Sequence, residues 1–183
     1  MTDASPDTSP LSQPILVASL PDDGLTVKIA PDAQVRAALA EDFGIPGIPA
    51  LTAQVTLVPG RKGSVHVTGH IDAVVTQTCV VTLEDFDAPV SEDIDLTFAP
   101  EDQLPEVRPG AEIDVTELDI PDPLVDGTVD VGAVVAEFLA LGLDPYPRKP
   151  GAAFKGPDEP GPEQASPFAA LSRLRGGGGE GAK

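Results

Sequence analysis

The sequence predicts an α+β fold: mainly an antiparallel β-sheet or a partly closed barrel, with two short helices and disordered N- and C-terminal tails. Three observations predict it. Apolar and polar residues alternate over long stretches, as in half-buried antiparallel strands. Two segments repeat apolar residues at helical spacing behind a capping aspartate. Twenty-one prolines and eighteen glycines in 183 residues indicate many turns and at least one disordered segment.

The length fits one domain with flexible ends. Residues 1–13 are rich in Ser, Asp, Pro and Thr, and we expect them to be disordered. Residues 14–149 form the single predicted domain. Residues 150–183 are expected to be a flexible tail rich in Gly, Pro and Glu, with a short apolar motif at 167–175.

The first elements are a strand at 15–20, a turn at 21–24 and a strand at 25–29, which together predict a hairpin. A short helix follows, with Asp32 as N-cap and Gly44 as its stop. Its apolar positions are Val35, Leu39 and Phe43.

Clean alternation then predicts a strand at 51–57, a loop at 59–63, a long strand at 65–81 and its hairpin partner at 90–98. Gly69 is a candidate β-bulge. The apolar face of the long strand carries Val65, Val67, Ile71, Ala73, Val75, Cys79 and Val81. The opposite face carries His66, Thr68, His70, Asp72, Thr76 and Thr78.

Residues 84–130 hold sixteen Asp or Glu and one base, Arg108, for a local formal charge of −15. Short extended segments are predicted at Ile113/Val115, Leu118/Ile120 and Leu124/Val125. Pro121 and Pro123 fit sheet edges. The clearest helix spans 131–141, with Asp130 as N-cap and Gly142 and Pro145 after it.

The formal net charge of −19, from thirty acidic and eleven basic residues, makes broad phosphate contact unfavourable. An acidic surface favours basic partners, such as proteins that coat rRNA, or simply maintains solubility. Met1 to Leu11 show no signal peptide and no apolar run is long enough to span a bilayer, so we expect a cytoplasmic protein without membrane contact.

Catalytic and metal-binding patterns are weak, and we expect neither an enzyme nor a cofactor. His66 and His70 stand about 13 Å apart on one strand face, too far for one metal ion. Cys79 is the only cysteine, which excludes an intramolecular disulfide and a Cys-rich zinc site; a buried position is expected. Adjacent carboxylates such as Glu84/Asp85 are most simply a solvated surface, with carboxylate catalysis as the remaining alternative.

The apolar motif in the tail places Phe168, Leu171 and Leu174 three residues apart, with Arg173 and Arg175 between and after them. Two interpretations remain open. The motif docks back onto its own domain, or it forms a short helix in a partner's groove.

Two stretches resemble the YceD family of large-ribosomal-RNA-subunit accumulation proteins. They are Cys79-Val80-Val81-Thr82-Leu83-Glu84 with the strand to Phe98, and Val125 to Leu141 followed by Asp144-Pro145-Tyr146-Pro147-Arg148. The family pattern has Arg and a second Cys where this chain has Val81 and Thr82. The chain resembles the alphaproteobacterial branch without the extra cysteines, so no metal site is carried over.

The resemblance implies a role in accumulation or processing of large-subunit (23S) rRNA during ribosome assembly. We expect a non-enzymatic factor that binds a basic ribosomal or rRNA-processing protein. The predicted partner contacts are Glu84, Asp85, Glu137, Phe168, Leu171 and Leu174. The alternative is direct rRNA binding through a local basic patch, with Arg61, Lys62, Arg148 and Lys149 as candidate contacts. The oligomeric state stays open.

Overall fold

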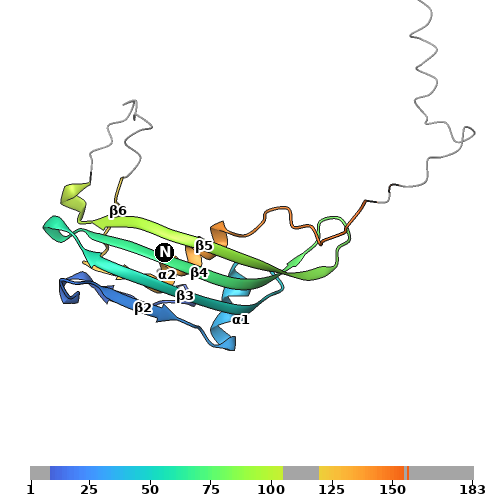
Figure 1. Ribbon diagram of the computed structural model, residues 1–183, viewed down its shortest axis with the longest axis horizontal. Coiled ribbons are helices and arrows are strands. Elements are labelled where there is room, and N and C mark those ends of the chain that lie inside the picture. The colour runs from blue at the N-terminus through green and yellow to red at the C-terminus, as the bar shows by residue number, and fades with distance from the viewer. Residues whose placement is uncertain (1–8, 105–119, 155, 157–183) are drawn as a thin grey trace, which may run out of the picture.

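A computed structural model describes residues 9–104, 120–154 and 156 of the chain (Figure 1). Seven strands, two α-helices and three short 3-10 helices make up this part. In chain order they are β1 Pro14–Leu16, η1 Val17–Ser19, β2 Leu25–Ile29, α1 Ala33–Asp42, β3 Gly47–Pro59, η2 Arg61–Gly63, β4 Val65–Thr78, β5 Asp85–Ala99, η3 Glu101–Gln103, β6 Asp122–Pro123, β7 Thr128–Asp130 and α2 Val131–Leu141.

The main sheet has five strands in the order β2-β3-β4-β5-β6. All neighbours are antiparallel except β5 and β6, which pair in parallel at Phe98 and Ala99. Strands β1 and β7 form a separate antiparallel pair. The described strands therefore form an open sheet and not a closed barrel, and the α+β prediction is confirmed.

Both helices lie against one face of the sheet, which we term the inner face; the other is the outer face (Figure 1). Strict alternation along the strands separates the two. On β4 the inner side chains Val65, Val67, Ile71 and Val75 are fully shielded from solvent, whereas His66 and His70 are exposed on the outer face. The predicted face of each β4 residue is confirmed, although the strand ends at Thr78 and not at Val81.

Aspartates cap both α-helices, as predicted. An Asp32 carboxylate oxygen accepts the N–H groups of Gln34 and Val35 at 2.9 and 3.0 Å. Asp130 accepts the N–H of Ala133 at 3.0 Å, and the same oxygen accepts the Gln13 N–H at 2.7 Å. These bonds satisfy helix N–H groups that have no partner within the helix. The bond between Gln13 and Asp130 also joins the N-terminal segment to the start of α2.

The predicted hairpin between residues 15–20 and 25–29 is wrong. Strand β1 is only three residues long and pairs with β7, so that Ile15 faces Val129 across 114 residues of chain. Strand β2 pairs with β3 instead, with Val27 opposite Val55. The Pro21–Gly24 turn is real, but it separates strands of two different sheets.

The β-bulge predicted at Gly69 is also wrong, because the register runs unbroken from Gly69 to Val55 on one side and to Ile94 on the other. A Cβ atom at Gly69 would lie 2.7 Å from the Gln54 carbonyl oxygen. Glycine is needed there for close backbone approach. The register shifts instead within β3, between Gly47 and Ala50.

The predicted edge position of Pro123 is confirmed, because β6 is the last strand of the sheet. The segments expected around Ile113/Val115 and at Leu118 lie outside the described residues. Near the N-terminus, Leu11 is buried in the core, so packing begins before residue 14. Among the described residues, no helix is long and apolar enough to cross a membrane.

Candidate functional site

The outer face of β4 and β5 carries a concentration of carboxylates. Five aspartates point to this face: Asp72 from β4, and Asp85, Asp87, Asp93 and Asp95 from β5. Neither strand contains Lys or Arg. The nearest cation in register is Lys28 on β2, two strands away from β4, in the cross-strand row Lys28, Gln54, His70 and Asp93. We refer to these five aspartates and their surroundings as the acidic face.

Cross-strand hydrogen bonds hold three of these aspartates in position, Asp93 through His70 and two through threonines. The Thr76 and Thr78 hydroxyls donate to Asp87 and Asp85, each at 2.7 Å. Most carboxylate surface nevertheless stays open, since the side chains of Asp72, Asp93 and Asp95 are 70%, 87% and 77% exposed. Water solvates these groups, so their mutual repulsion is modest and they remain available to an approaching cation.

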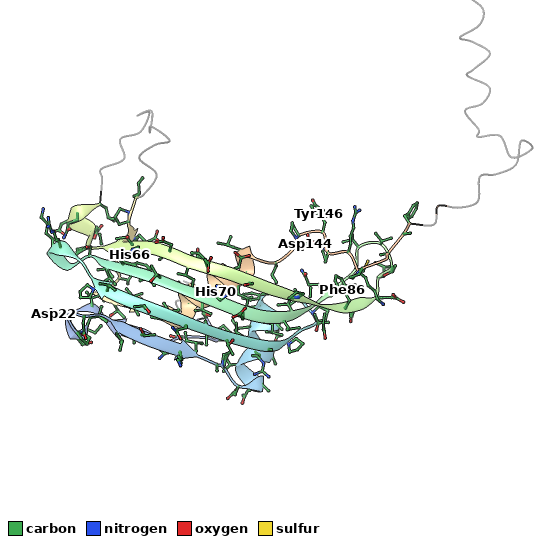
Figure 2. All side chains as sticks on the ribbon, in the orientation of Figure 1. Asp22, His66, His70, Phe86, Asp144 and Tyr146 are labelled. Atoms are coloured by element: carbon green, nitrogen blue, oxygen red, sulfur yellow. The ribbon has the colours of Figure 1, made fainter. Side chains whose placement is uncertain are left out.

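Both histidines lie along β4 within the acidic face (Figure 2). His70 Nδ1 is 2.6 Å from Asp93, and its Nε2 is 3.2 Å from the Ser91 hydroxyl and 3.5 Å from Asp72. The hydrogen bond to Asp93 is the main cause of a raised His70 pKa, and the charge of Asp72 adds to it. His66 Nδ1 is 3.3 Å from the Thr97 hydroxyl, and Nε2 is 3.6 Å from Asp95.

The β4–β5 hairpin tip is held by the segment that follows α2. Figure 2 places Asp144 and Tyr146 of this segment at the same end of the sheet as Phe86. The Gln77 amide donates to the Asp144 carbonyl at 3.0 Å, and the Val80 N–H donates to the Pro147 carbonyl at 2.9 Å. The two stretches that resemble the family are therefore in direct contact, which gives their joint occurrence a structural reason.

Cys79 is buried at the centre of this tip, as expected. Its sulfur accepts the Val81 N–H at 3.4 Å. A hydrogen bond from the Thr82 hydroxyl is the main influence on the thiol and lowers its pKa, whereas burial raises it. The N–H groups of Lys149, Thr82 and Val81 lower it further, so that the pKa is about 7. Thr82, which stands where the family pattern has a second cysteine, thus contacts the remaining one through a hydrogen bond.

The structure separates the predicted partner contacts. Asp85 belongs to the acidic face, whereas Glu84 forms an ion pair with Lys149 at 3.0 Å. Glu137 lies on α2, against the inner face, and lines a groove there. Phe168, Leu171 and Leu174 lie outside the described residues. Glu137 and Asp85 therefore do not share one surface.

The candidate rRNA contacts are also divided. Arg61 and Lys62 are exposed in the β3–β4 connection, while Arg148 and Lys149 lie beside the β4–β5 tip. These two connections flank opposite ends of β4, whose 14 residues span roughly 43 Å at about 3.3 Å per residue. The four bases do not form one continuous patch.

Asp72, Asp87, Asp93 and Asp95 were absent from the residues predicted to contact a partner. For Asp72, Asp93 and Asp95 the signal was present in the sequence, because they occupy polar positions of two alternating strands predicted to pair, whereas Asp87 precedes the strand predicted at 90–98. Their proximity across the strands follows from the register, which pairs His70 with Asp93 and Thr76 with Asp87. Within the described residues, no group of three or more His, Cys, Asp or Glu side chains could hold a metal ion.

Comparison with known proteins places the chain in a family. The family model of the large ribosomal RNA subunit accumulation protein YceD matches residues 67–175, which is more than half of the chain. No curated protein matches the chain, and no solved structure does. The match includes β5, the hairpin tip and α2, and it confirms the resemblance seen in their sequences. The chain belongs to the YceD family of large ribosomal RNA subunit accumulation proteins.

Proposed function

We propose that this protein supports the accumulation of large-subunit rRNA by binding a basic ribosomal or rRNA-processing protein through the acidic face, without catalysis. The observation that carries the proposal is the set of five outward aspartates on β4 and β5, two adjacent strands without a Lys or Arg. A surface of one charge sign attracts a basic partner over a distance and orients it during the encounter. The family assignment supplies the link to rRNA.

Hydrogen bonding adds to this argument. Thr76, Thr78 and His70 hold three of the five carboxylates in fixed positions while leaving them in contact with solvent. Arg and Lys side chains of a partner would then meet ordered acceptors, which reduces the side-chain entropy lost on binding. Asp85 extends the acidic face to the hairpin tip, next to Glu84.

The test is affinity purification of the tagged full-length protein from growing cells at low salt, with and without RNase. We expect a basic large-subunit or processing protein to remain bound after RNase treatment. Replacing Asp72, Asp87, Asp93 and Asp95 with Asn should lower its recovery about tenfold, because four attractive charges are lost. Recovery that is equal for the variant and the parent would contradict the proposal.

A matched control removes the same amount of charge elsewhere. Asp22, Asp23, Glu41 and Asp42 are exposed in the turn before β2 and at the end of α1. Their replacement with Asn or Gln should leave recovery unchanged. If the partner is lost on RNase treatment, and if replacing Arg61 and Lys62 reduces the salt dependence of rRNA binding, direct rRNA binding is the function instead.

A further inference from the structure

We propose that residues 167–175 dock in cis into the groove between α2 and the β5 edge of the sheet. The groove has a volume of about 710 Å³. Its apolar wall consists of Leu96 and Phe98 from β5 and of Val134, Phe138 and Leu141 from α2. It lies on the inner-face side of the sheet, away from the acidic face, so this inference does not depend on the proposed function.

In the part of the chain that the structure describes, the edge of β5 beside the groove is covered at one end. Within the described residues, β6 pairs with β5 at Phe98 and Ala99 alone. Leu141 in the last turn of α2 is 74% exposed, and Val125 on the opposite rim is 70% exposed. Two large apolar side chains on the rim of one groove indicate a surface that an apolar partner covers.

Residues 167–175 have the chemistry that fits this surface. In a helix, Phe168, Leu171 and Leu174 would form one apolar stripe, the pattern of helices that bind in grooves. The groove also carries the exposed carboxylates of Asp122, Asp126 and Glu137. Arg173 and Arg175 bring positive charges to the same segment, so both the apolar and the charged parts are complementary.

The chain is long enough for the contact. Pro150 lines a small cavity together with Phe86 and Val90 of β5. From Phe86 to Leu96, at the groove, the strand spans roughly 33 Å at about 3.3 Å per residue. The 18 steps from Pro150 to Phe168 can span up to roughly 60 Å when extended. A contact within one chain is therefore well within reach.

The extent of the family match is a second observation. It runs from Val67 through β5 and α2 and ends at Arg175, the last residue of the apolar segment. The matched stretch thus contains both walls of the groove and the segment proposed to fill it. Strands β2 and β3 and helix α1, which do not line the groove, fall outside the match.

Residues 105–119 lie in the sequence between η3 and β6, and are the competing occupant of the groove. Their charge argues against them. They carry five carboxylates and only one base, Arg108, and would face the carboxylates of Asp122, Asp126 and Glu137. Like charges in close contact repel, whereas the two arginines of residues 167–175 attract.

Disulfide trapping in the full-length protein tests the proposal. Leu171→Cys is combined with Leu141→Cys in the groove, or with Gln54→Cys on the outer face as the control. Leu141 and Gln54 are exposed, and native Cys79 is buried, so neither pair disturbs the core. Under mild oxidation we expect the groove pair to form an intramolecular disulfide about tenfold faster than the control pair, because docking raises the local thiol concentration.

Two results would overturn the proposal: equal rates for both pairs, or a groove-pair disulfide that joins two chains and so indicates a second copy as the occupant. A charge exchange provides an independent check. Glu137→Arg should reduce the groove-pair rate about threefold or more, and adding Arg173→Glu with Arg175→Glu should restore it. No recovery in the combined variant would contradict the predicted charge pairing.

Discussion

The outer and inner faces of the five-stranded sheet are built from alternate residues of the same strands. The inner face carries buried apolar side chains, whereas the outer face carries exposed aspartates and histidines. On β4, Ile71 is fully buried under the helices, while its neighbour His70 lies in the acidic face. Packing of the inner face stabilises the fold. The outer face can carry several like charges because water solvates them. Substitutions on the outer face should therefore leave stability largely unchanged, whereas substitutions on the inner face should lower it.

The largest expected effect tests this separation directly. Ile71→Ala should lower the free energy of unfolding by about 2–5 kcal/mol, because it removes buried methyl groups and leaves a cavity. The matched control, Asp72→Ala at the next residue, removes an exposed carboxylate and should change it by less than about 0.5 kcal/mol. Urea unfolding curves measure both. Similar values for the two variants would contradict the division between the faces.

A smaller effect is expected at Asp130, where an inward-side carboxylate supports the fold by hydrogen bonding. Burial opposes its ionisation, but the Ser12 hydroxyl and the N–H groups of Gln13 and Ala133 outweigh burial and lower the Asp130 pKa. Asp130→Ala should lower the free energy of unfolding at pH 7 by about 1–2 kcal/mol, through loss of the helix cap.

The pH dependence at Asp130 has a definite sign. A carboxylate whose pKa is lower in the folded state stabilises the fold fully above its unfolded pKa of about 3.9, and this contribution is lost as the pH falls toward the folded value. The difference between parent and Asp130→Ala should thus shrink below about pH 4. A difference that stays constant between pH 7 and pH 3 would show that the carboxylate charge is not involved.

The smallest effect concerns the charge state of the acidic face. Hydrogen bonding to Asp93 raises the His70 pKa, and Asp72 contributes as well. Asp93→Asn should move the His70 pKa back toward its ordinary value, as followed by NMR titration of the imidazole. An Asp22→Asn variant serves as the control, because that residue lies in a distant turn. An unchanged His70 titration in Asp93→Asn would exclude the proposed hydrogen bond.

The raised pKa of His70 determines how this residue makes stability depend on pH. A histidine whose pKa is higher in the folded state stabilises the fold below its unfolded pKa of about 6.5, and that contribution disappears as the pH rises through the folded pKa. Protonation also adds a positive charge among five aspartates. Binding of a basic partner to the acidic face should therefore strengthen as the pH rises through the His70 pKa.

Local signals in the sequence predicted the faces of the strands and the ends of the helices. Alternation placed Ile71 and His70 correctly, and the two capping aspartates located α1 and α2, because these features depend on neighbours within a few residues. The hairpin before β2 failed for the opposite reason. A convincing turn between two apolar runs cannot reveal that the true partner of β1 is β7, more than 110 residues away.

The candidate site shows the same limit. The sequence predicted Asp85 and Glu137 as partner contacts, but no periodicity indicates that β5 and α2 present them on opposite sides of the sheet. The acidic face depends on the β4–β5 register, and the groove depends on packing between α2 and β5. The acidic face follows from the register of a single hairpin, whereas the groove arises from contacts between residues far apart in the chain.

The buried sulfur of Cys79 can be used to detect opening of the β4–β5 tip. Hydrogen bonds lower the pKa of this thiol to about 7, which favours the reactive thiolate, but its burial keeps reagents away. The rate at which Cys79 is alkylated should therefore report how often the β4–β5 tip opens. Since the segment after α2 closes that tip through Pro147 and Lys149, a partner that displaces this segment would be detected as faster labelling of one cysteine.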